Sequence, residues 1–229
     1  MEIFQNSVFF GISLTFLAYG IGLLLKKKLK LAVFNPILIA VAIIITVLVS
    51  FNIDYDSYQN GAGFISGMIT PSTVCLAVPL YEKLDILKKN YKALIAGISS
   101  GVVTSLLNIL LFAFIFSFDH ATYATFLPKS ITTAIGMGIS EELGGYVAVT
   151  ASVIIITGII GNMLAEAVCR IFRITEPVAK GVAIGTSSHA MGTAKAMEIG
   201  EIEGAVSSLS LVLAGIITVA GASAFANFW

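Results

Sequence analysis

The chain has 229 residues, of which 57% are hydrophobic and only 11% are charged, and its formal net charge is zero. An ordinary soluble domain carries roughly 25% charged residues, so the composition excludes that class and predicts an integral membrane protein. Without an excess of basic residues, the sequence also lacks the charge pattern typical of nucleic-acid binding.

Apolar runs that fit a bilayer occur five times, because a helix needs about 20 residues to cross roughly 30 Å of hydrocarbon. They cover residues 7–25, 31–51, 94–118, 147–172 and 205–228. The runs do not alternate apolar and polar residues, so transmembrane helices are predicted. A sixth crossing, residues 60–81, is interrupted at "ITPSTVC", where Thr70 is a candidate helix cap and Pro71 a candidate first helical residue.

Basic residues between the runs predict the orientation, because positive loops face the cytoplasm. The N-terminus lacks the basic lead and cleavage site of a secretory signal, so the first run is predicted to be a retained helix. The N-terminus, the turn at residues 118–120 and the C-terminus are then expected outside. The residues expected on the cytoplasmic side are Lys26, Lys27, Lys28, Lys30, Lys83, Lys88, Lys89, Lys92, Arg170, Arg173 and Lys180.

Two further segments are predicted to enter the membrane and return on the same side. Asp119 is expected outside and Arg170 inside, with one uninterrupted run between them, so residues 122–143 must form a re-entrant hairpin. The same argument makes residues 177–199 a second hairpin, which enters from the cytoplasm. Each arm has about ten residues and a rise of about 15 Å, half the bilayer.

Each hairpin has helix-breaking and capping residues at its tip. In the first, hydroxyl residues precede a short helix over residues 134–143, which Gly144 ends. In the second, three hydroxyl residues precede a helix over residues 189–199, which Gly200 ends. The capping candidates are Ser130, Thr132, Thr133, Thr186, Ser187 and Ser188.

The two hairpins also resemble each other in sequence. A shift of 56 residues superposes Gly136 on Gly192, Ala134 on Ala190, Glu142 on Glu198, Gly144 on Gly200 and Ser152 on Ser208. One hairpin plus one span makes a single crossing, so consecutive copies have opposite orientation, as in the inverted repeats of secondary transporters. The predicted fold is therefore all-α, with about six transmembrane helices and two re-entrant hairpins in an inverted repeat. A single domain over residues 1–229 is divided into 1–58, 59–118, 119–173 and 174–229.

Half-helices that end in the membrane predict an anion site. Their first amides lack intrahelical partners, and the aligned dipoles favour negative charge at those ends. A small carboxylate is the expected ligand, because ionisable groups at membrane depth usually mark pathways. An alternative is that the hydroxyls only hydrogen-bond between packed helices. The candidate substrate-binding residues are Lys129, Ser130, Thr132, Thr133, Thr186, Ser187, Ser188, His189, Thr193, Thr70, Ser72 and Thr73.

His189 is the first candidate for ion coupling, since a bound carboxylate would favour its protonated form. A neutral histidine that bridges two helices is the alternative. Glu141 and Glu142 are further coupling candidates, and sodium could replace the proton. Glu166 and Arg170, four residues apart, are expected to form a structural ion pair.

Neither an enzyme nor a metal site is predicted. Ser187 and Ser188 are direct neighbours of His189 and cannot easily align as nucleophile and base, and no acid lies nearby to orient the histidine. The two histidines and two cysteines are too far apart in sequence for a ligand cluster, and no cofactor is expected. Cys75 and Cys169 lie in apolar runs and are predicted to be small buried side chains.

Three motifs, "LPKSITTAIGMGIS", "GVAIGTSSHAMGTAKAMEIG" and "TPSTVCLAVPLY", occur in an order and spacing that resemble the LrgB/CidB family of bacterial membrane proteins. The resemblance covers nearly the whole chain. It implies a multi-pass protein of the bacterial cytoplasmic membrane, an antiholin-like modulator of murein hydrolase activity, and a small LrgA/CidA-type partner. A plastid glycolate/glycerate transporter carries a similar domain. The family pattern often has a proline at position 134 and a carboxylate near position 138, where this chain has Ala134 and Gly138.

Two alternative functions are therefore predicted. The first is an ion-coupled transporter of small 2-hydroxy or 2-oxo monocarboxylates, such as pyruvate, glycolate or lactate. The second is an antiholin-like regulator that acts by pore assembly with its partner. The two symmetric interruptions favour transport, because a pore former needs only amphipathic helices and oligomerisation, and a homo-oligomer is expected in either case.

Overall fold

The computed structural model describes residues 7–29 and 34–229. All regular structure in these residues is helical, and the chain is an all-α integral membrane protein. Contacts divide it into two compact units, Met1–Cys75 (unit 1) and Leu76–Trp229 (unit 2), so the predicted 59–118 segment contributes to both. Lys30, the N-terminal residues 1–6 and residues 31–33 of the predicted 31–51 span lie outside the described residues.

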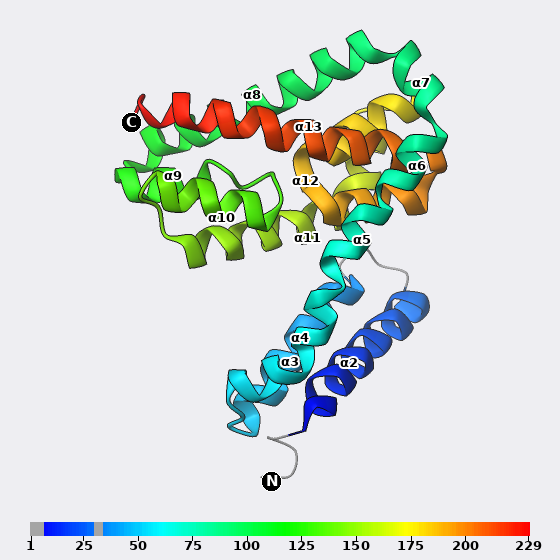
Figure 1. The fold of residues 1–229 in the computed structure, drawn as a ribbon, viewed down its shortest axis with the longest axis vertical. Coiled ribbons are helices and arrows are strands. Elements are labelled where there is room, and N and C mark those ends of the chain that lie inside the picture. The colour runs from blue at the N-terminus through cyan, green and yellow to red at the C-terminus, as the bar shows by residue number, and fades with distance from the viewer. Residues whose placement is uncertain (1–6, 30–33) are drawn as a thin grey trace. The chain divides into compact units, whose positions relative to one another are not determined.

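The described residues of unit 1 form four helices (Figure 1): α2 (Val8–Leu29), α3 (Pro36–Ser50), α4 (Tyr55–Gly67) and α5 (Ile69–Cys75). Helix α2 packs against α3 and α4, and the Thr15 hydroxyl on α2 lies 2.9 Å from the Tyr58 hydroxyl on α4. Asn35 starts α3, because its side chain accepts a hydrogen bond from the Ile37 amide at 2.8 Å and Pro36 occupies the first turn.

Unit 2 contains α6 (Ala77–Glu82), α7 (Leu84–Lys89), α8 (Tyr91–Phe116), α9 (His120–Phe126), α10 (Thr133–Glu142), α11 (Val147–Ile171), α12 (Pro177–Ile199) and α13 (Glu201–Ala226). Helix α13 packs against α6, α8, α10 and α12. Its buried face consists mainly of Gly, Ala and Ser, which lets neighbouring helix backbones approach closely. Helix α8 contributes a stripe at helical spacing, formed by Leu94, Ile98, Val102, Leu106, Ile109 and Ala113.

Five helical stretches within the described residues are long and apolar enough to cross a membrane. They are Phe9–Leu29, Tyr55–Glu82, Tyr91–Phe116, Val147–Ile171 and Glu201–Ala226. Helix α3 has only 15 residues, and at 1.5 Å per residue it rises about 22 Å, which is shorter than the 31–51 run suggests. Thr70 is wrong as a helix cap, because α5 already begins at Ile69 and Thr70 and Pro71 follow inside it.

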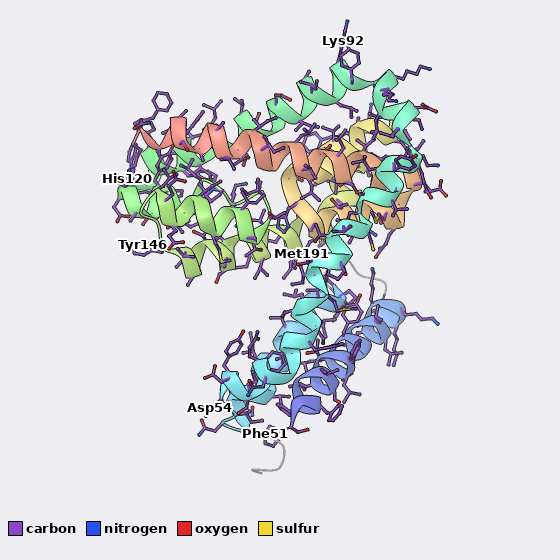
Figure 2. All side chains as sticks on the ribbon, viewed as in Figure 1. Phe51, Asp54, Lys92, His120, Tyr146 and Met191 are labelled. Carbon is purple, nitrogen blue, oxygen red and sulfur yellow. The ribbon has the colours of Figure 1, made fainter. Side chains whose placement is uncertain are left out.

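The long helices of unit 2 have two chemically different ends. At the charged end, Lys83 pairs with Glu201 at 2.7 Å and Lys180 with Glu203 at 3.9 Å. At the aromatic end, the Trp229 indole donates to the Phe118 carbonyl at 2.7 Å. Figure 2 shows His120 and Tyr146 at this aromatic end, whereas Lys92 projects from the start of α8. Within unit 2, the residues expected inside thus lie at the charged end, and residues 118–120 and the C-terminal Trp229, expected outside, lie at the aromatic end.

Candidate functional site

The first break lies between α9 and α10, where residues 127–132 leave the helical conformation. Thr132 has extended dihedral angles and precedes α10, which begins at Thr133, one residue before the expected start. Within the described residues the Thr132 side chain makes no capping hydrogen bond, so the expected cap geometry is present without its bond. Gly144 follows the helix end at φ 77°, a conformation that glycine adopts without steric cost.

The tip of this first hairpin holds a cation. Lys129 Nζ donates to Ser130 Oγ at 2.9 Å, and Ser130 Oγ lies 3.1 Å from Ser105 Oγ near the middle of α8. Within residues 7–29 and 34–229, no carboxylate forms an ion pair with Lys129. The hairpin tip therefore places a basic side chain, with no carboxylate partner among the described residues, at the level of the middle of the long helices.

The second break is a single residue, His189, with φ 42° and ψ −139°. Gly192 lies close to the Ile184 carbonyl, a contact between residues eight apart that a straight helix cannot make, so the second arm of α12 folds back toward the first. The predicted caps Thr186 and Ser187 are wrong in their role. They belong to the last turn of the first arm and donate at 2.7 Å to the carbonyls of Val182 and Ala183.

The His189 side chain is buried against α11. Its Nε2 lies 3.0 Å from the Ile154 carbonyl, and a Cβ at Gly158 would collide with the imidazole ring. A carbonyl can only accept, so Nε2 carries the proton and donates. This contact holds a residue with an unfavourable positive φ, and it agrees with the alternative that His189 bridges two helices.

One cavity joins the two breaks. It has a volume of about 410 Å³ and lies between α11 and the first arm of α12; we call it the α11–α12 cavity. Lys129 from the first break and Ser187 and Ser188 from the second line it. The structure thus brings three of the predicted site residues together. The remaining lining residues are Thr157, Ile160, Gly161, Leu164, Ala165, Val168, Cys169, Ile174, Ala183 and Ile184.

A second cavity of about 720 Å³, which we call the basic vestibule, lies at the charged end. Three basic residues, Arg170, Arg173 and Lys180, and two acidic residues, Glu166 and Glu198, line it. It shares Cys169 and Ile174 with the α11–α12 cavity. The expected salt bridge between Glu166 and Arg170 is not among those that the described residues form. Glu166 pairs with Lys195, which also binds Glu198 at 3.1 Å.

The other predicted site residues lie elsewhere. Thr193 is buried and bonds the His189 carbonyl at 3.0 Å and Ser207 on α13 at 2.9 Å. Thr186 lines a separate cavity of about 490 Å³ between α8 and α12. Glu141 and Glu142 are exposed at the end of α10. Thr70, Ser72 and Thr73 are exposed on α5 in unit 1, as is Cys75, which contradicts its predicted burial, whereas Cys169 is buried as expected.

Sequence reasoning missed the wall that α11 contributes. Thr157, Gly161, Leu164 and Val168 line the cavity at spacings of three and four residues, so they share one helix face. A Cβ at Gly161 would collide with the Ser188 side chain. The available signal was "TGIIGN", a cluster of small and polar residues inside an otherwise apolar run.

Comparison with known proteins agrees with the sequence motifs. The profile of the LrgB-like family matches residues 15–228. Antiholin-like protein LrgB of Bacillus cereus (strain B4264) is 36% identical over 212 residues, which cover 92% of each chain. The protein of the same name from Bacillus anthracis (strain CDC 684 / NRRL 3495) matches to the same extent. No solved structure matches the chain.

Proposed function

The chain belongs to the LrgB-like family, and we propose that it transports small 2-hydroxy or 2-oxo monocarboxylates across the bacterial cytoplasmic membrane. Pyruvate, glycolate and lactate are the candidate substrates. The observation that carries the proposal is the α11–α12 cavity, in which Lys129 and Ser188 from two separate chain breaks face the same space. A monocarboxylate would neutralise the ammonium group and accept hydrogen bonds from the hydroxyl.

Lys129 supports an anionic rather than a neutral substrate. A charged group at membrane depth is costly, and such groups usually pair or lie on a transport pathway. Its described polar partner is the neutral Ser130 hydroxyl, which does not compensate the charge. The basic vestibule beside the cavity would raise the local concentration of anions at the charged end.

Uptake of labelled pyruvate, glycolate and lactate into proteoliposomes that contain only this protein tests the proposal. Lys129→Gln keeps a long polar side chain but removes the charge, so it should raise the apparent Km at least tenfold, because hydrogen bonds to charged groups contribute about 1.5 to 3 kcal/mol. Lys88→Gln is the matched control, since Lys88 lies on α7 and does not line the α11–α12 cavity. Unchanged uptake by the Lys129 variant would contradict the proposal.

Coupling to a proton or to sodium is part of the proposal. As the proton-coupling group, His189 would take up the proton at Nδ1, because Nε2 already donates to the Ile154 carbonyl. Glu141 and Glu142 are the alternative carriers. Comparing uptake with and without a pH gradient, in the parent protein and in His189→Gln, separates these possibilities from sodium coupling.

The name of the relatives favours a second function. Antiholin-like protein LrgB is 36% identical, which supports a role in controlling murein hydrolase activity through assembly with an LrgA/CidA-type partner or with further copies of the chain. Phe9, Phe16 and Leu24 are exposed on α2, and such an apolar face fits packing against lipid or another membrane helix. Two measurements distinguish direct regulation from an effect of carboxylate flux. Copurification of a tagged chain with the small partner supports direct regulation. Loss of autolysis control in a transport-deficient Lys129→Gln strain supports an effect of carboxylate flux.

A further inference from the structure

The geometry points to a narrower substrate class: we propose that the α11–α12 cavity binds 2-oxo or 2-hydroxy acids whose hydrocarbon chains are longer than those of pyruvate, glycolate and lactate. The inference rests on the proposed function and specifies the ligand of the same site. The carboxylate lies at Lys129 and Ser188, and the hydrocarbon chain lies along α11 toward Ile174.

The polar and apolar linings of the cavity are segregated. Lys129 belongs to the first break and Ser187 and Ser188 directly precede the second, near the middle of the long helices, whereas Val168 and Ile174 lie toward the charged end. Thr157 and Cys169 are twelve residues apart on α11, which corresponds to about 18 Å of helix. Over most of that length, hydrocarbon side chains form the wall of the cavity.

The volume also exceeds what a three-carbon acid requires. If each heavy atom of pyruvate took the roughly 30 Å³ that one water molecule occupies in the liquid, the acid would fill less than half of the 410 Å³. The unfilled part would lie along Ile160, Leu164 and Val168. Pyruvate or glycolate would leave that wall to water or lipid, whereas an aliphatic chain on the same acid would cover it.

Cations lie at both ends of the cavity, and their surroundings favour the carboxylate at the breaks. Arg170 and Arg173 of the vestibule are exposed and Lys180 pairs with Glu203, whereas Lys129 is half-buried. Lys129 has no carboxylate ion pair in the described part of the chain, so the acid head belongs at the breaks. The far end of the cavity reaches the basic vestibule through Cys169 and Ile174, which gives the acid a route from the charged end.

Binding of a 2-oxo acid series to the protein in lipid nanodiscs tests this inference. Pyruvate, 2-oxobutyrate, 2-oxopentanoate, 2-oxohexanoate and 2-oxooctanoate share one head group and compete with labelled 2-oxohexanoate, and empty nanodiscs correct for partition into lipid. Because Ile160, Leu164 and Val168 are 41 to 49% exposed, each methylene is only partly buried. The affinity should therefore rise about two- to fourfold per methylene until the cavity is filled.

Two variants locate the effect. Leu164→Gln places a polar group on the cavity wall and should lower the affinity for 2-oxohexanoate more than that for pyruvate. Ile156→Gln is the matched control, because Ile156 is 55% exposed on the same helix but does not line the cavity, and it should leave the series unchanged.

The outcomes separate this inference from the proposed function. A series in which pyruvate binds as tightly as the longer acids overturns the longer-chain class and leaves the transport proposal standing. Palmitate, added as a probe for lipid tails, should compete less well than 2-oxohexanoate; if it competes better than every 2-oxo acid, a membrane lipid tail occupies the cavity and the longer-chain class is overturned as well. If Lys129→Gln binds the whole series like the parent, or if no acid binds, the proposed function fails as well.

Discussion

Gly161→Ala should destabilise the contact between α11 and α12 that forms the cavity. A Cβ at Gly161 would overlap both the Cβ and the Oγ of Ser188, which is only 2% exposed. Overpacking of this kind costs about 1 to 3 kcal/mol. A chain of this length loses roughly 2 to 4 °C in melting temperature per kcal/mol, so we expect a drop of roughly 2 to 12 °C in a size-exclusion thermal-shift assay in detergent.

A double-mutant cycle with Ser188→Gly identifies the cause. Removal of the serine side chain leaves Cα as the nearest Ser188 atom, 3.6 Å from the new methyl group, so the double variant should recover about 0.5 to 3 kcal/mol of coupling. Gly138→Ala is the control, because within the described chain nothing lies within 4 Å of a Cβ there, and it should be neutral or stabilising. Additive effects of the two substitutions would refute the close approach of α11 and α12.

Three further predictions concern other parts of unit 2. In a Cys75→Ser background, an anionic methanethiosulfonate should modify Cys169 faster than a cationic one, each rate being taken relative to that with a free thiol. Arg173→Gln should slow the anionic reagent by up to about fivefold, the factor for two unit charges 4 Å apart in water; equal relative rates would contradict the basic vestibule. Thr150→Val should lower the free energy of unfolding by about 1 to 3 kcal/mol, because Thr150 Oγ1 lies 2.7 Å from Ser140 Oγ and 3.1 Å from the Thr125 carbonyl in a buried site. Ser152→Ala, on the exposed face of α11, is the control and should change the melting temperature little. The hydrogen bond from Thr122 lowers the pKa of the Asp119 carboxyl. The stabilisation of α9 by this carboxylate is therefore present above the unfolded pKa and is lost as pH falls through the lower folded pKa. Asp119→Asn should remove this acid-dependent loss of melting temperature, and an unchanged pH profile would show that the cap contributes nothing.

Hydrophobic length and helix punctuation predicted the helices well, because both are local properties of the chain. Helices α8, α11 and α13 follow the apolar runs, and Gly144 ends α10 as its position indicates. The sequence could not predict that the second break falls on His189. At φ 42° and ψ −139° the His189 backbone lies outside the left-handed helical region in which non-glycine residues with positive φ usually occur, and the conformation depends on a contact with Ile154 in another helix.

The candidate site was predictable only in part, for a similar reason. Lys129, Ser187 and Ser188 stand out as polar residues in apolar surroundings. The hydroxyls of Thr186 and Thr193 look equivalent in sequence, but one bonds its own helix and the other bonds α13. The direction of a side chain at a helix break depends on tertiary packing, which a single sequence does not contain.

The contacts of the two hairpins show why Lys129 is the informative residue. At the 56-residue shift, the approach of Gly136 to Pro128 corresponds to that of Gly192 to Ile184, and the bond between Thr150 and Thr125 corresponds to the packing of Val206 on Gly181. Likewise, Ser130 contacts Ser105 of α8, and the corresponding Thr186 lies against Gly101, one turn away. The equivalent positions therefore keep their contacts while their chemistry changes between hydrogen bonding and apolar packing, as expected of residues that hold a fold. Lys129 corresponds to Gly185, which packs against Ser207 and Ser210, so its charge has no counterpart in the second hairpin, and packing symmetry does not explain it.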